Sequence, residues 1–580
     1  MRERWIVETK KADFNELGRE YGVSPLVIRC MVNRGVVAKE DIDRYLNGTL
    51  ADLYDPILMK GVPEAVQLLQ RAVEGGEKIG VASDFDCDGI FSAYILWKGL
   101  RKVGLKVCLY TPDRVKEGYG VNERIVDAAK KEGISLLVTC DNGIAANEAV
   151  AYAKAQGMTV IVTDHHEVQE ALPEADVVVD PKQAGETYPF SGLCGAGVAF
   201  KLVCALYDAC AIPAKKKNEL LEYVAIATVA DVMELKDENR ILVKYGLQAL
   251  EQTDNAGLQA LLEVQGLRGK KINTGHIGFI LGPCFNAAGR IATVADSFDL
   301  LMETDDKKAI FKAQHLKELN KSRKAMTEEG TEQAFALLEG KTPDDIIVLL
   351  LSDVHESLVG IIAGRVKERT GHPAIIFTYA GQGMVKGSGR SIEGYDMFQE
   401  LLKCKDLMTH FGGHKMAAGM TLPEENLEQL RQRLNGHSTL RQEDFYPVVR
   451  IDAAMPIGYA SEKLLSEFEK MEPFGVGNPK PVFAEQHFRI LRGQRLGKEK
   501  NVLKLRVENR LGSQMDALLF HGAGEFEQFI IQTFGEGELT RMYEGRENDI
   551  DVAFTYYPSI NDYRGNRTIQ IQISSYCRVE

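Results

Sequence analysis

Short apolar runs alternate with helical patterns from about residue 78 onward. The runs, each ending in polar or acidic residues, cover 78–83, 106–110, 135–139, 159–163 and 177–179. Between them, apolar residues recur with helical spacing at 91–103, 123–131 and 145–156. Strands that alternate with helices in this way predict a parallel sheet covered by helices on both faces. The first large domain is therefore expected to be α/β.

The pattern changes twice further along the chain. Residues 305–338 lack proline, contain only Gly330 as an interior breaker and are rich in Lys, Glu, Ala and Leu. A helix of that length would span about 50 Å at 1.5 Å per residue, which suggests a bridge between domains. Apolar runs at 345–351 and 373–378 predict a smaller α/β unit, whereas period-two alternation at 502–508 and 568–574 predicts a β domain.

These boundaries give five segments. We expect a helical N-terminal cap at 1–70, a parallel-sheet domain at 71–304, the bridging helix at 305–340, a smaller α/β domain at 341–440 and a β domain at 445–580. A chain of 580 residues has room for several such domains, because domains average about 150 residues.

Composition narrows the class of protein. Hydrophobic residues make up 45% and charged residues 26% of the chain, as in ordinary folded proteins. The longest aliphatic run, 346–351, is too short for a membrane span, and the N-terminus lacks the apolar stretch of a secretory signal. We therefore expect a cytoplasmic protein without membrane contact. The ten cysteines form no Cys-x-x-Cys pair, which argues against a zinc or dithiol site.

Acidic residues gather where the predicted strands end. Residues 83–89 read SDFDCDG, with Asp84, Asp86 and Asp88; Asp141 follows the third strand, and the fourth ends in Asp-His-His at 164–166. Asp231 in ATVADVMEL is a further candidate. Carboxylates at one sheet edge repel each other unless a cation neutralises them, and oxygen ligands with imidazole suit Mn²⁺ or Mg²⁺. Two such ions would support hydrolysis of a phosphodiester.

Structural alternatives exist for the same residues. Asp-x-Asp-x-Asp-Gly also opens calcium-binding loops, and single Asp residues often cap the helix that follows. A calcium loop needs Glu at its twelfth position, but counting from Asp84 that position is Ile95. An EF-hand is therefore disfavoured, whereas helix capping stays open.

The four acidic motifs, in this order and spacing, resemble the DHH phosphoesterase superfamily, whose signature is the Asp164-His165-His166 triplet. Several further segments resemble the RecJ family of single-strand-specific DNA exonucleases over about residues 50–580. They are EGYG at 117–120, NAAGR at 286–290, GSGRS at 387–391, FGGHKMAAG at 411–419 and PFGVGNP at 473–479. The resemblance implies a DHH domain, a smaller DHHA1 domain and a C-terminal OB-fold.

The resemblance also assigns roles residue by residue. It implies that the metal shell, for two Mn²⁺ or Mg²⁺ ions, consists of Asp84, Asp86, Asp88, Asp141, His165 and Asp231. It implies that His166 orients or stabilises the phosphate or supports the shell, and Asp141 is also a catalytic candidate. His414, in the glycine-rich turn of FGGH, is a candidate to reach the scissile phosphate, and the alternative is a packed turn residue. Pyrophosphatase-type members carry His four residues before the first Asp, where this chain has Gly80, so the share of Asp88 in the shell is expected to be larger.

A nuclease must also hold a polyanion, for which guanidinium forks are suited. By resemblance Arg114, Arg290, Ser388 and Arg390 are the candidates that grip the terminal phosphate; the alternative is solvated arginines in glycine-rich turns. SGLCGAG at 191–197 lacks a dinucleotide-binding spacing and is interpreted as a tight helix start near phosphate.

The C-terminal domain carries its own candidate surface in a protein whose formal net charge is −13. Residues 489–510 hold eight basic and two acidic residues, which fits an electrostatic groove for single strands on an OB-fold. Tyr556, Tyr557 and Tyr563 are candidates for base stacking, although aromatic residues on strands often belong to the core.

The leading hypothesis is a metal-dependent exonuclease that degrades single-stranded DNA from the 5′ end to mononucleotides in recombination and repair, with polarity and pathway taken from the resemblance. Single-stranded DNA is the expected partner; a helicase and a single-strand-binding protein are candidates, and a monomer is expected. The competing hypotheses are a phosphodiesterase for small molecules or short RNA and a non-catalytic DNA-binding scaffold.

Overall fold

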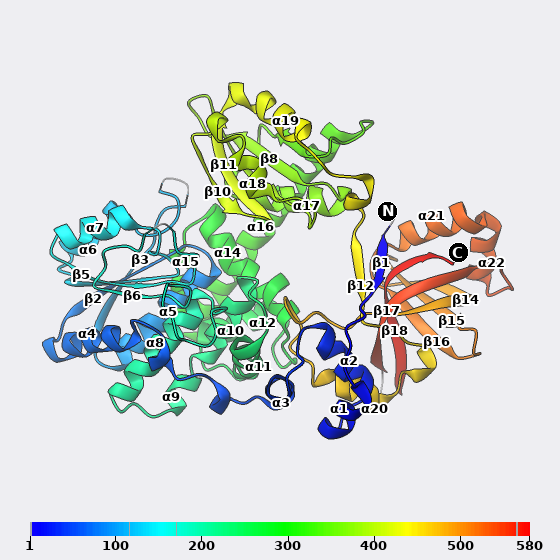
Figure 1. The fold of residues 1–580 in the computed structure, drawn as a ribbon, viewed down its shortest axis with the longest axis horizontal. Coiled ribbons are helices and arrows are strands. Elements are labelled where there is room, and N and C mark those ends of the chain that lie inside the picture. Colours follow the sequence, from blue (N-terminus) through cyan, green and yellow to red (C-terminus); the bar gives the residue numbers. More distant parts are fainter. Residues whose placement is uncertain (1–2, 115–116, 170, 564–565, 580) are drawn as a thin grey trace. The chain divides into compact units, whose positions relative to one another are not determined.

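The computed structural model describes residues 3–114, 117–169, 171–563 and 566–579 of the chain. It divides into two units, drawn with their helices and strands in Figure 1. The first unit comprises 53–233 and 241–447, and the second comprises 3–52, 234–240 and the chain from Val448 onward. The residues of the expected N-terminal cap are thus shared, because 3–52 belong to the second unit.

The first unit contains a five-stranded, all-parallel sheet in the order β3-β2-β4-β5-β6. The strands are β2 (Lys78–Ser83), β3 (Lys106–Tyr110), β4 (Leu136–Cys140), β5 (Thr159–Thr163) and β6 (Val177–Val179). The chain moves from β2 to β3 on one side and then to β4 on the other. In open parallel sheets such a reversal leaves a crevice at the carboxyl ends of the two strands, here β2 and β4.

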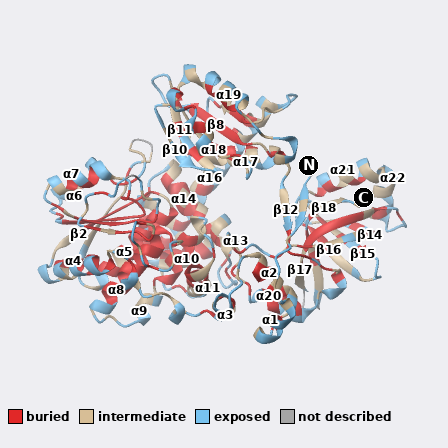
Figure 2. Cartoon of the chain, in the orientation of Figure 1, coloured by how far each residue is buried: buried red, intermediate tan, exposed pale blue. Residues whose placement is uncertain are grey.

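Helices cover both faces of this sheet, as the alternation predicts. On one face lie α5 (Cys87–Lys102) and α8 (Gly195–Ala209). These two pack closely because Gly99 of α5 faces Val203 of α8, where a Cβ would lie 2.6 Å from the valine methyls. On the other face, α6 (Glu123–Lys131) and α7 (Asn147–Ala155) bury Ile125 and Ala153 in a core that contains Leu137 and Val160 of the sheet. Figure 2 shows this sheet and α5 as predominantly buried.

The first unit continues through a helical region to the long helix that the sequence predicts. This region includes α10 (Leu221–Ala230), α12 (Ala256–Val264), α14 (Gly282–Ile291) and, from Ile241 onward, α11 (Asp237–Glu251). The long helix is α16 (Asp306–Leu338), which starts where Asp305 accepts the amide of Lys308 at 2.9 Å. The buried residues of α16 are mainly small and therefore permit close packing. Gly330, for example, lies against Ile362 of the following domain.

A second, mixed sheet follows α16 in the order β10-β11-β9-β8-β7, with only β7 and β8 parallel. Its strands are β7 (Ile347–Leu350), β8 (Ala374–Tyr379), β9 (Met384–Arg390), β10 (His410–His414) and β11 (Ala417–Pro423). Helix α17 (Val359–Thr370) packs through Ile362 and Val366 on a face that includes Ile376. The opposite face buries Ile375 and Phe377 with α18 (Met397–Leu402) and α19 (Leu427–Gly436).

The second unit contains a closed β barrel. Its strands are β14 (Phe483–Leu496), β15 (Val502–Glu508), β16 (Gln514–Leu519), β17 (Asp551–Tyr563) and β18 (Asn566–Arg578). They are paired in the order β14-β15-β16-β18-β17, and β17 pairs back onto β14. Helices α21 (Ala523–Phe534) and α22 (Glu536–Glu544) lie between the third and fourth strands of the chain order. This five-stranded closed arrangement is that of an OB-fold.

Helices α1 (Phe14–Tyr21), α2 (Pro25–Asn33) and α3 (Lys39–Asn47) complete the second unit. Val27 and Met31 of α2 share one hydrophobic core with Phe483 and Phe554 of the barrel. Strand β1 (Arg4–Val7) pairs in parallel with β12 (Val448–Ile451). The N-terminal helices are therefore part of the barrel's core.

The PFGVGNP motif holds residues 234–240 within the second unit. The amide of Leu235 donates to the carbonyl of Val476 at 2.7 Å. A Cβ on Gly475 would lie 2.7 Å from Leu235, and one on Gly477 would lie 2.9 Å from Glu234. The two glycines of the motif therefore permit the close approach of this segment.

Arg240 is the buried centre of the same contact. Its guanidinium lies 3.7 Å from the ring centroid of Tyr45 and donates to the backbone carbonyls of Tyr45, Lys470, Met471 and Glu472 at 2.8 to 3.0 Å. A fork of five N–H donors suits such a group of carbonyls, which a lysine cannot match. Arg240 thereby ties three separate stretches of the second unit together.

Among the described residues, no helix combines the length and the apolar character needed to cross a membrane.

We expect Arg240→Met to lower the free energy of unfolding of the second unit by roughly 3 kcal/mol, because several backbone carbonyls lose a charged donor together. Urea denaturation followed by hydrogen exchange in the strands β14 to β18 would measure this. Arg541→Met is the control, since Arg541 is about half exposed and, among the described residues, its ion-pair partner is Glu538 on the same helix. Its cost is expected to stay below about 1 kcal/mol. Equal losses in both variants would contradict the prediction.

Candidate metal centre

The loop after β2 places three carboxylates at the crevice. Asp86 is the N-cap of α5 and accepts the amide of Gly89 at 3.1 Å, so helix capping holds for this residue. Gly89 is required here, since a Cβ would lie 2.5 Å from the carbonyl oxygen of Asp84. The loop is therefore tight, and Asp84 and Asp88 are almost fully buried beside the cap.

Asp88 is fixed by the start of another helix. Its two carboxylate oxygens accept the amides of Gly195 and Ala196 at 2.6 and 2.8 Å, at the N-terminus of α8. Helix N-termini stabilise anions through unpaired amides and the helix dipole. The SGLCGAG segment is thus a tight helix start, as expected, but the anion it holds is Asp88.

Asp141 follows β4 in a left-handed backbone conformation with φ of 59°. The turn is held by Asn142, whose side chain donates to the carbonyls of Ala82 and Cys140 at 3.1 and 2.9 Å. Gly195 packs directly on Asp141, where a Cβ would lie 2.7 Å from the aspartate Cβ. Left-handed non-glycine residues with local strain often mark functional sites.

The three residues Asp164, His165 and His166 that follow β5 have different environments. Asp164 accepts the Ile144 amide at 2.9 Å and lies 2.7 Å from Nδ1 of His166. Burial lowers the pKa of His166, but the hydrogen bond that its Nδ1–H donates to Asp164, together with the negative charge of Asp164, outweighs burial and raises the pKa to about 9. Asp164 therefore orients a cationic, half-exposed His166, while the adjacent His165 is buried.

His165 is the point where the predicted ligands converge. Its Nε2 lies 3.1 Å from Oδ1 of Asp141, 3.6 Å from Oδ2 of Asp88 and 3.8 Å from Oδ2 of Asp231. Asp231 reaches the site from the C-terminal end of α10 and is followed by Val232 with φ of 60°. All six predicted metal ligands thus come from four strand or helix ends around one crevice.

The potential ligands form three overlapping groups, and within each group the ligand atoms lie within 4.8 Å of one another. The groups are Asp84, Asp86 and Asp141; Asp88, His165 and Asp231; and Asp141, His165 and His166. Oxygen ligands with one or two imidazoles match the preference of Mn²⁺ and, with fewer imidazoles, of Mg²⁺. The donor set therefore fits hard divalent cations.

The negative charges of the cluster are only partly compensated by the cationic groups of the described residues, such as Arg114 and His166. Burial, then the neighbouring carboxylates Asp88 and Asp86, raises the pKa of Asp141, and burial followed by Asp88 raises the pKa of Asp231 to about 8. Burial and Asp86 raise the pKa of Asp84. Oδ1 of Asp84 and Nδ1 of His165 have no hydrogen-bond partner among the described residues. Buried carboxylates that raise each other's pKa form a site that a cation would neutralise.

Arg114 and Arg290 lie beside this cluster. The guanidinium of Arg114 lies 4.5 Å from the ring centroid of Phe85, which also contacts Tyr119. Arg290, on α14, donates to the carbonyl of Ser357. Burial and then Arg114 lower the pKa of Arg290 to about 10. Two mutually repelling, partly buried guanidinium groups next to the crevice form a site that an anion would stabilise.

Ser388 and Arg390 are brought together on β9. Nη1 of Arg390 donates to Oγ of Ser388 at 2.9 Å. Both side chains lie over Gly360 near the start of α17, where a Cβ would lie within 2.9 Å of each of them. The glycines on either side of Ser388 pack on Phe377 and Met397 of the opposite face. The GSGRS motif thus presents a serine and an arginine on one face of the sheet.

His414 stays apart from these contacts in the described structure. It ends β10 in an exposed hairpin, and its Nδ1 accepts the amide of Met416 at 3.3 Å. Its predicted role at the scissile phosphate stays a prediction.

Asn286 is a residue of the site that sequence reasoning did not single out. Its Oδ1 accepts the amide of Cys87 at 2.8 Å, within the acidic loop. Gly289 of the same helix lies so close to Phe85 that a Cβ would be 2.5 Å from its carbonyl oxygen. Asn286 and Gly289 belong to the NAAGR motif, in which the sequence assigned a role to Arg290 alone.

The basic stretch at 489–510 is partly neutralised by carboxylates from elsewhere. Arg495 pairs with Glu527 at 2.6 Å, and Lys504 and Arg506 pair with Asp516. The tyrosines of β17 also differ from the stacking prediction: Tyr556 is fully buried and Tyr557 packs against the core. The side chain of Tyr563 lies outside the described residues.

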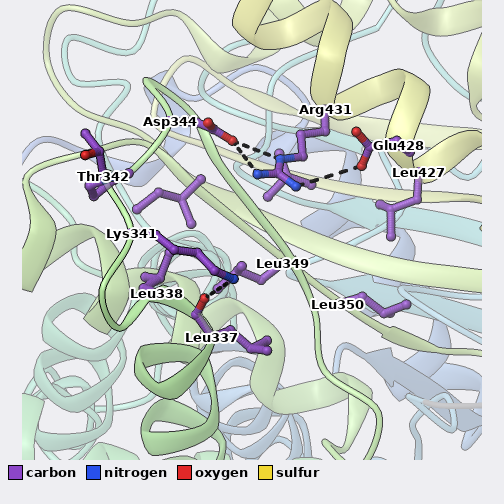
Figure 3. Close-up of a pocket in the computed structure, with 13 residues that line it drawn as sticks. Leu337, Leu338, Lys341, Thr342, Asp344, Leu349, Leu350, Leu427, Glu428 and Arg431 are labelled. Atoms are coloured by element: carbon purple, nitrogen blue, oxygen red, sulfur yellow. Dashed lines mark hydrogen bonds and ion pairs between the residues drawn. The ribbon is translucent and has the colours of Figure 1, made fainter.

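A separate cavity of about 300 Å³ lies in the domain of the second sheet (Figure 3). It is lined by the end of α16, by β7 and by α19, and Arg431 on its wall pairs with Asp344 at 2.7 Å. Its lining residues include none of the predicted site residues.

Comparison with known proteins agrees with this geometry. Family models match residues 78–228 as the DHH family N-terminal domain, 344–437 as the DHHA1 domain and 451–575 as the RecJ OB domain.

Two full-length relatives carry the name single-stranded-DNA-specific exonuclease RecJ. The protein from Bacillus subtilis is 36% identical, with 99% of this chain and 73% of the relative covered. The protein from Escherichia coli is 33% identical, with 95% of both chains covered. Crystal structures of RecJ from Thermus thermophilus with Mn²⁺ and with Mg²⁺ match all of this chain and 80% and 79% of theirs, with TM-scores of 0.81 and 0.76 at 27% and 26% identity.

We expect Mn²⁺ to raise the melting temperature of the native chain and to leave that of Asp141→Asn almost unchanged. A hundredfold excess over the dissociation constant corresponds to about 2.7 kcal/mol of stabilisation. Without metal, Asp141→Asn should melt at the same or a higher temperature, because one repelling carboxylate is removed and asparagine tolerates the left-handed conformation.

Thermal unfolding with chelator and with Mn²⁺ measures both effects. Glu148→Gln is the control for charge, since Glu148 is exposed on α7 outside the cluster. An equal Mn²⁺ response in Asp141→Asn and the native chain would show that the ions bind elsewhere.

Proposed function

The chain belongs to the RecJ family of single-stranded-DNA-specific exonucleases, and from this membership we propose that it removes 5′-mononucleotides from the 5′ end of single-stranded DNA. It is a metal-dependent hydrolase of phosphodiester bonds that uses Mn²⁺ or Mg²⁺. The observation that carries the proposal is the convergence of five carboxylates and His165 at the strand-order reversal between β2 and β4.

The two separate ligand groups of the crevice support two ions. Asp84, Asp86 and Asp141 form one group, and Asp88, His165 and Asp231 form the other. Bound divalent cations supply Lewis-acid chemistry, since they favour deprotonation of water and neutralise charge on the phosphate. Asp141 lies closest to His165 and would thus connect the two groups.

His166 complements the cations from the rim. Asp164 holds its Nδ1 and keeps the ring protonated near neutral pH, so the Nε2 proton is the one that can be donated to a phosphate oxygen. The half-exposed ring is accessible to a strand, in contrast to the buried His165. We assign His166 the role of stabilising the phosphate and place His414 as a second candidate.

The four phosphate-binding candidates support recognition of a strand end. Arg114 and Arg290 lie beside the acidic loop, and Ser388 and Arg390 lie together over α17. None of the three arginines forms an ion pair with a carboxylate among the described residues. Guanidinium groups left without an internal counter-ion are suited to bind a terminal phosphate, which would set the 5′ polarity.

An enzyme restricted to single strands depends on other proteins to produce them. We infer that a helicase supplies its substrate, that a single-strand-binding protein shares it, and that the chain acts as a monomer in DNA repair and recombination.

The first test is digestion of single-stranded and duplex DNA, labelled at either end, with Mn²⁺, Mg²⁺ or chelator. We expect 5′-mononucleotides from single strands only and no reaction with chelator. Asp141→Ala and His165→Ala should each lower kcat more than about a hundredfold, because even outer-shell substitutions at metal sites cost about 10- to 100-fold. Glu148→Gln should keep native activity. Retained activity in both crevice variants would place the chemistry elsewhere.

A second test addresses the strand end. Arg390→Lys keeps the charge but loses the planar fork, so we expect KM for a 5′-phosphorylated strand to rise about tenfold, equivalent to about 1.4 kcal/mol. KM for a 5′-hydroxyl strand should change less. Arg369→Lys, which alters an arginine over the ring of Phe335 on the same domain, is the matched control. Equal changes for both strand ends would argue against terminal phosphate recognition.

A further inference from the structure

The outer face of β15 and β16 carries alternating polar side chains. On β15 the buried Leu503, Leu505 and Val507 alternate with outward Lys504, Arg506 and Glu508. The antiparallel register places Arg506 opposite Asp516 of β16, and Arg492 of β14 opposite Arg506 on the other side. Two basic side chains of β15 therefore lie beside one aspartate, with a third basic residue on the next strand.

This face has no aromatic platform on its strands. The positions of β15 and β16 that alternate with the core are Val502, Lys504, Arg506, Glu508, Gln514, Asp516 and Leu518, of which Leu518 is buried. Tyr557, on β17, is covered by the ammonium group of Lys480 at 3.9 Å from its ring centroid, and the half-exposed Phe520 follows the end of β16. The second and third strands of an OB-fold commonly bind single strands. Here the two strands carry basic groups for phosphates and no aromatic side chain for stacked bases.

Asp516 forms ion pairs with both basic side chains of β15 on this face, Lys504 and Arg506. Its Oδ2 lies 2.8 Å from Nζ of Lys504, and its Oδ1 lies 3.2 Å from Nη1 of Arg506. A carboxylate that bridges an ammonium and a guanidinium with two oxygens holds them as a phosphate would. All three side chains are 30% to 46% exposed, so a strand can reach the pair from solvent.

We propose that Asp516 is a tethered competitor of DNA, which a strand phosphate must displace from Lys504 and Arg506 when it binds the outer face of the barrel. The proposal rests on the proposed function, since it assumes that single-stranded DNA is the ligand of the barrel.

The competition lowers the affinity of this face for a phosphate and makes binding readily reversible. A displaced Asp516 stays covalently close to the two cations, so it re-forms its ion pairs whenever the phosphate leaves. An exonuclease must shift its strand by one nucleotide after every cut, and a tight phosphate clamp would oppose that shift. Asp516 therefore sets how firmly the barrel grips the strand while leaving the crevice chemistry unchanged.

The test is the salt dependence of binding to a long oligothymidylate, with chelator present to prevent cleavage. We expect Asp516→Asn to bind about three- to tenfold more tightly at low salt, because one nearby negative charge is removed. The slope of log K against log salt should steepen by about 0.7 for each further phosphate that the barrel neutralises. Glu508→Gln makes the same charge change on the same face, where Glu508 accepts a hydrogen bond only from Gln514 among the described residues, and should leave the slope unchanged.

A double-mutant cycle identifies the cations. Arg506→Gln alone should weaken binding little, because Asp516 already occupies that guanidinium, whereas Arg506→Gln in the Asp516→Asn background should remove most of the increase in affinity. The proposal is overturned if Asp516→Asn binds no more tightly than Glu508→Gln, or if the increase persists without Arg506. Melting temperatures of all variants control for folding.

Hydrolysis of a trinucleotide at saturating concentration, where affinity for the strand does not limit the rate, separates the two proposals. If Asp516→Asn hydrolyses the trinucleotide at the native rate and its DNA affinity is unchanged, the proposed competition by Asp516 is refuted and the proposed nuclease function is not. Loss of metal-dependent hydrolysis in the native chain would instead refute the proposed function.

Discussion

The repulsion among carboxylates at the end of β2 and β4 is the constraint around which the first unit is organised. Several charged groups of the site are held by backbone or side-chain groups that fix their position without neutralising the whole cluster, whereas Oδ1 of Asp84 and Nδ1 of His165 have no hydrogen-bond partner among the described residues. Asp88 is held by the start of α8, Asp86 caps α5, and Asp164 fixes the neighbouring histidine. The remaining charge is left for divalent cations. Stability is thus lower at the crevice so that metal affinity can be higher there.

The fold could be predicted from the sequence where apolar periodicity is local. The strands at 106–110, 159–163 and 177–179 and the helix at 123–131 have the predicted bounds, and the long helix begins within one residue of the prediction. The assignment of residues 3–52 and 234–240 to the barrel unit could not be predicted, because it depends on contacts such as those of Arg240 with residues about 200 and 230 positions away. Periodicity carries no information about such distant partners.

The site shows the same division. Acidic residues directly after parallel strands must lie at one sheet edge, so the sequence could indicate that Asp84, Asp141 and His165 meet. Asp231, at the end of a helix, was a further candidate that strand order could not place at this edge, and its assignment to the metal shell came from the resemblance. The contacts of Asn286 with the acidic loop and of the Gly195 and Ala196 amides with Asp88 could not be predicted, because these residues are distant from the loop in the sequence and carry no motif for such contacts.

The basic stretch of the barrel illustrates why charge counts along a sequence overstate a binding surface. Within 489–510 basic residues far outnumber acidic ones, but Glu527 and Asp516 lie outside that window and pair with three of the cations. A β barrel places residues of neighbouring strands opposite each other, so the charge that a phosphate meets is set by register. Affinity for a strand at this face therefore depends on how readily Asp516 is displaced from Lys504 and Arg506. These ion pairs follow from the register of β15 and β16, which the charge count of the sequence does not include.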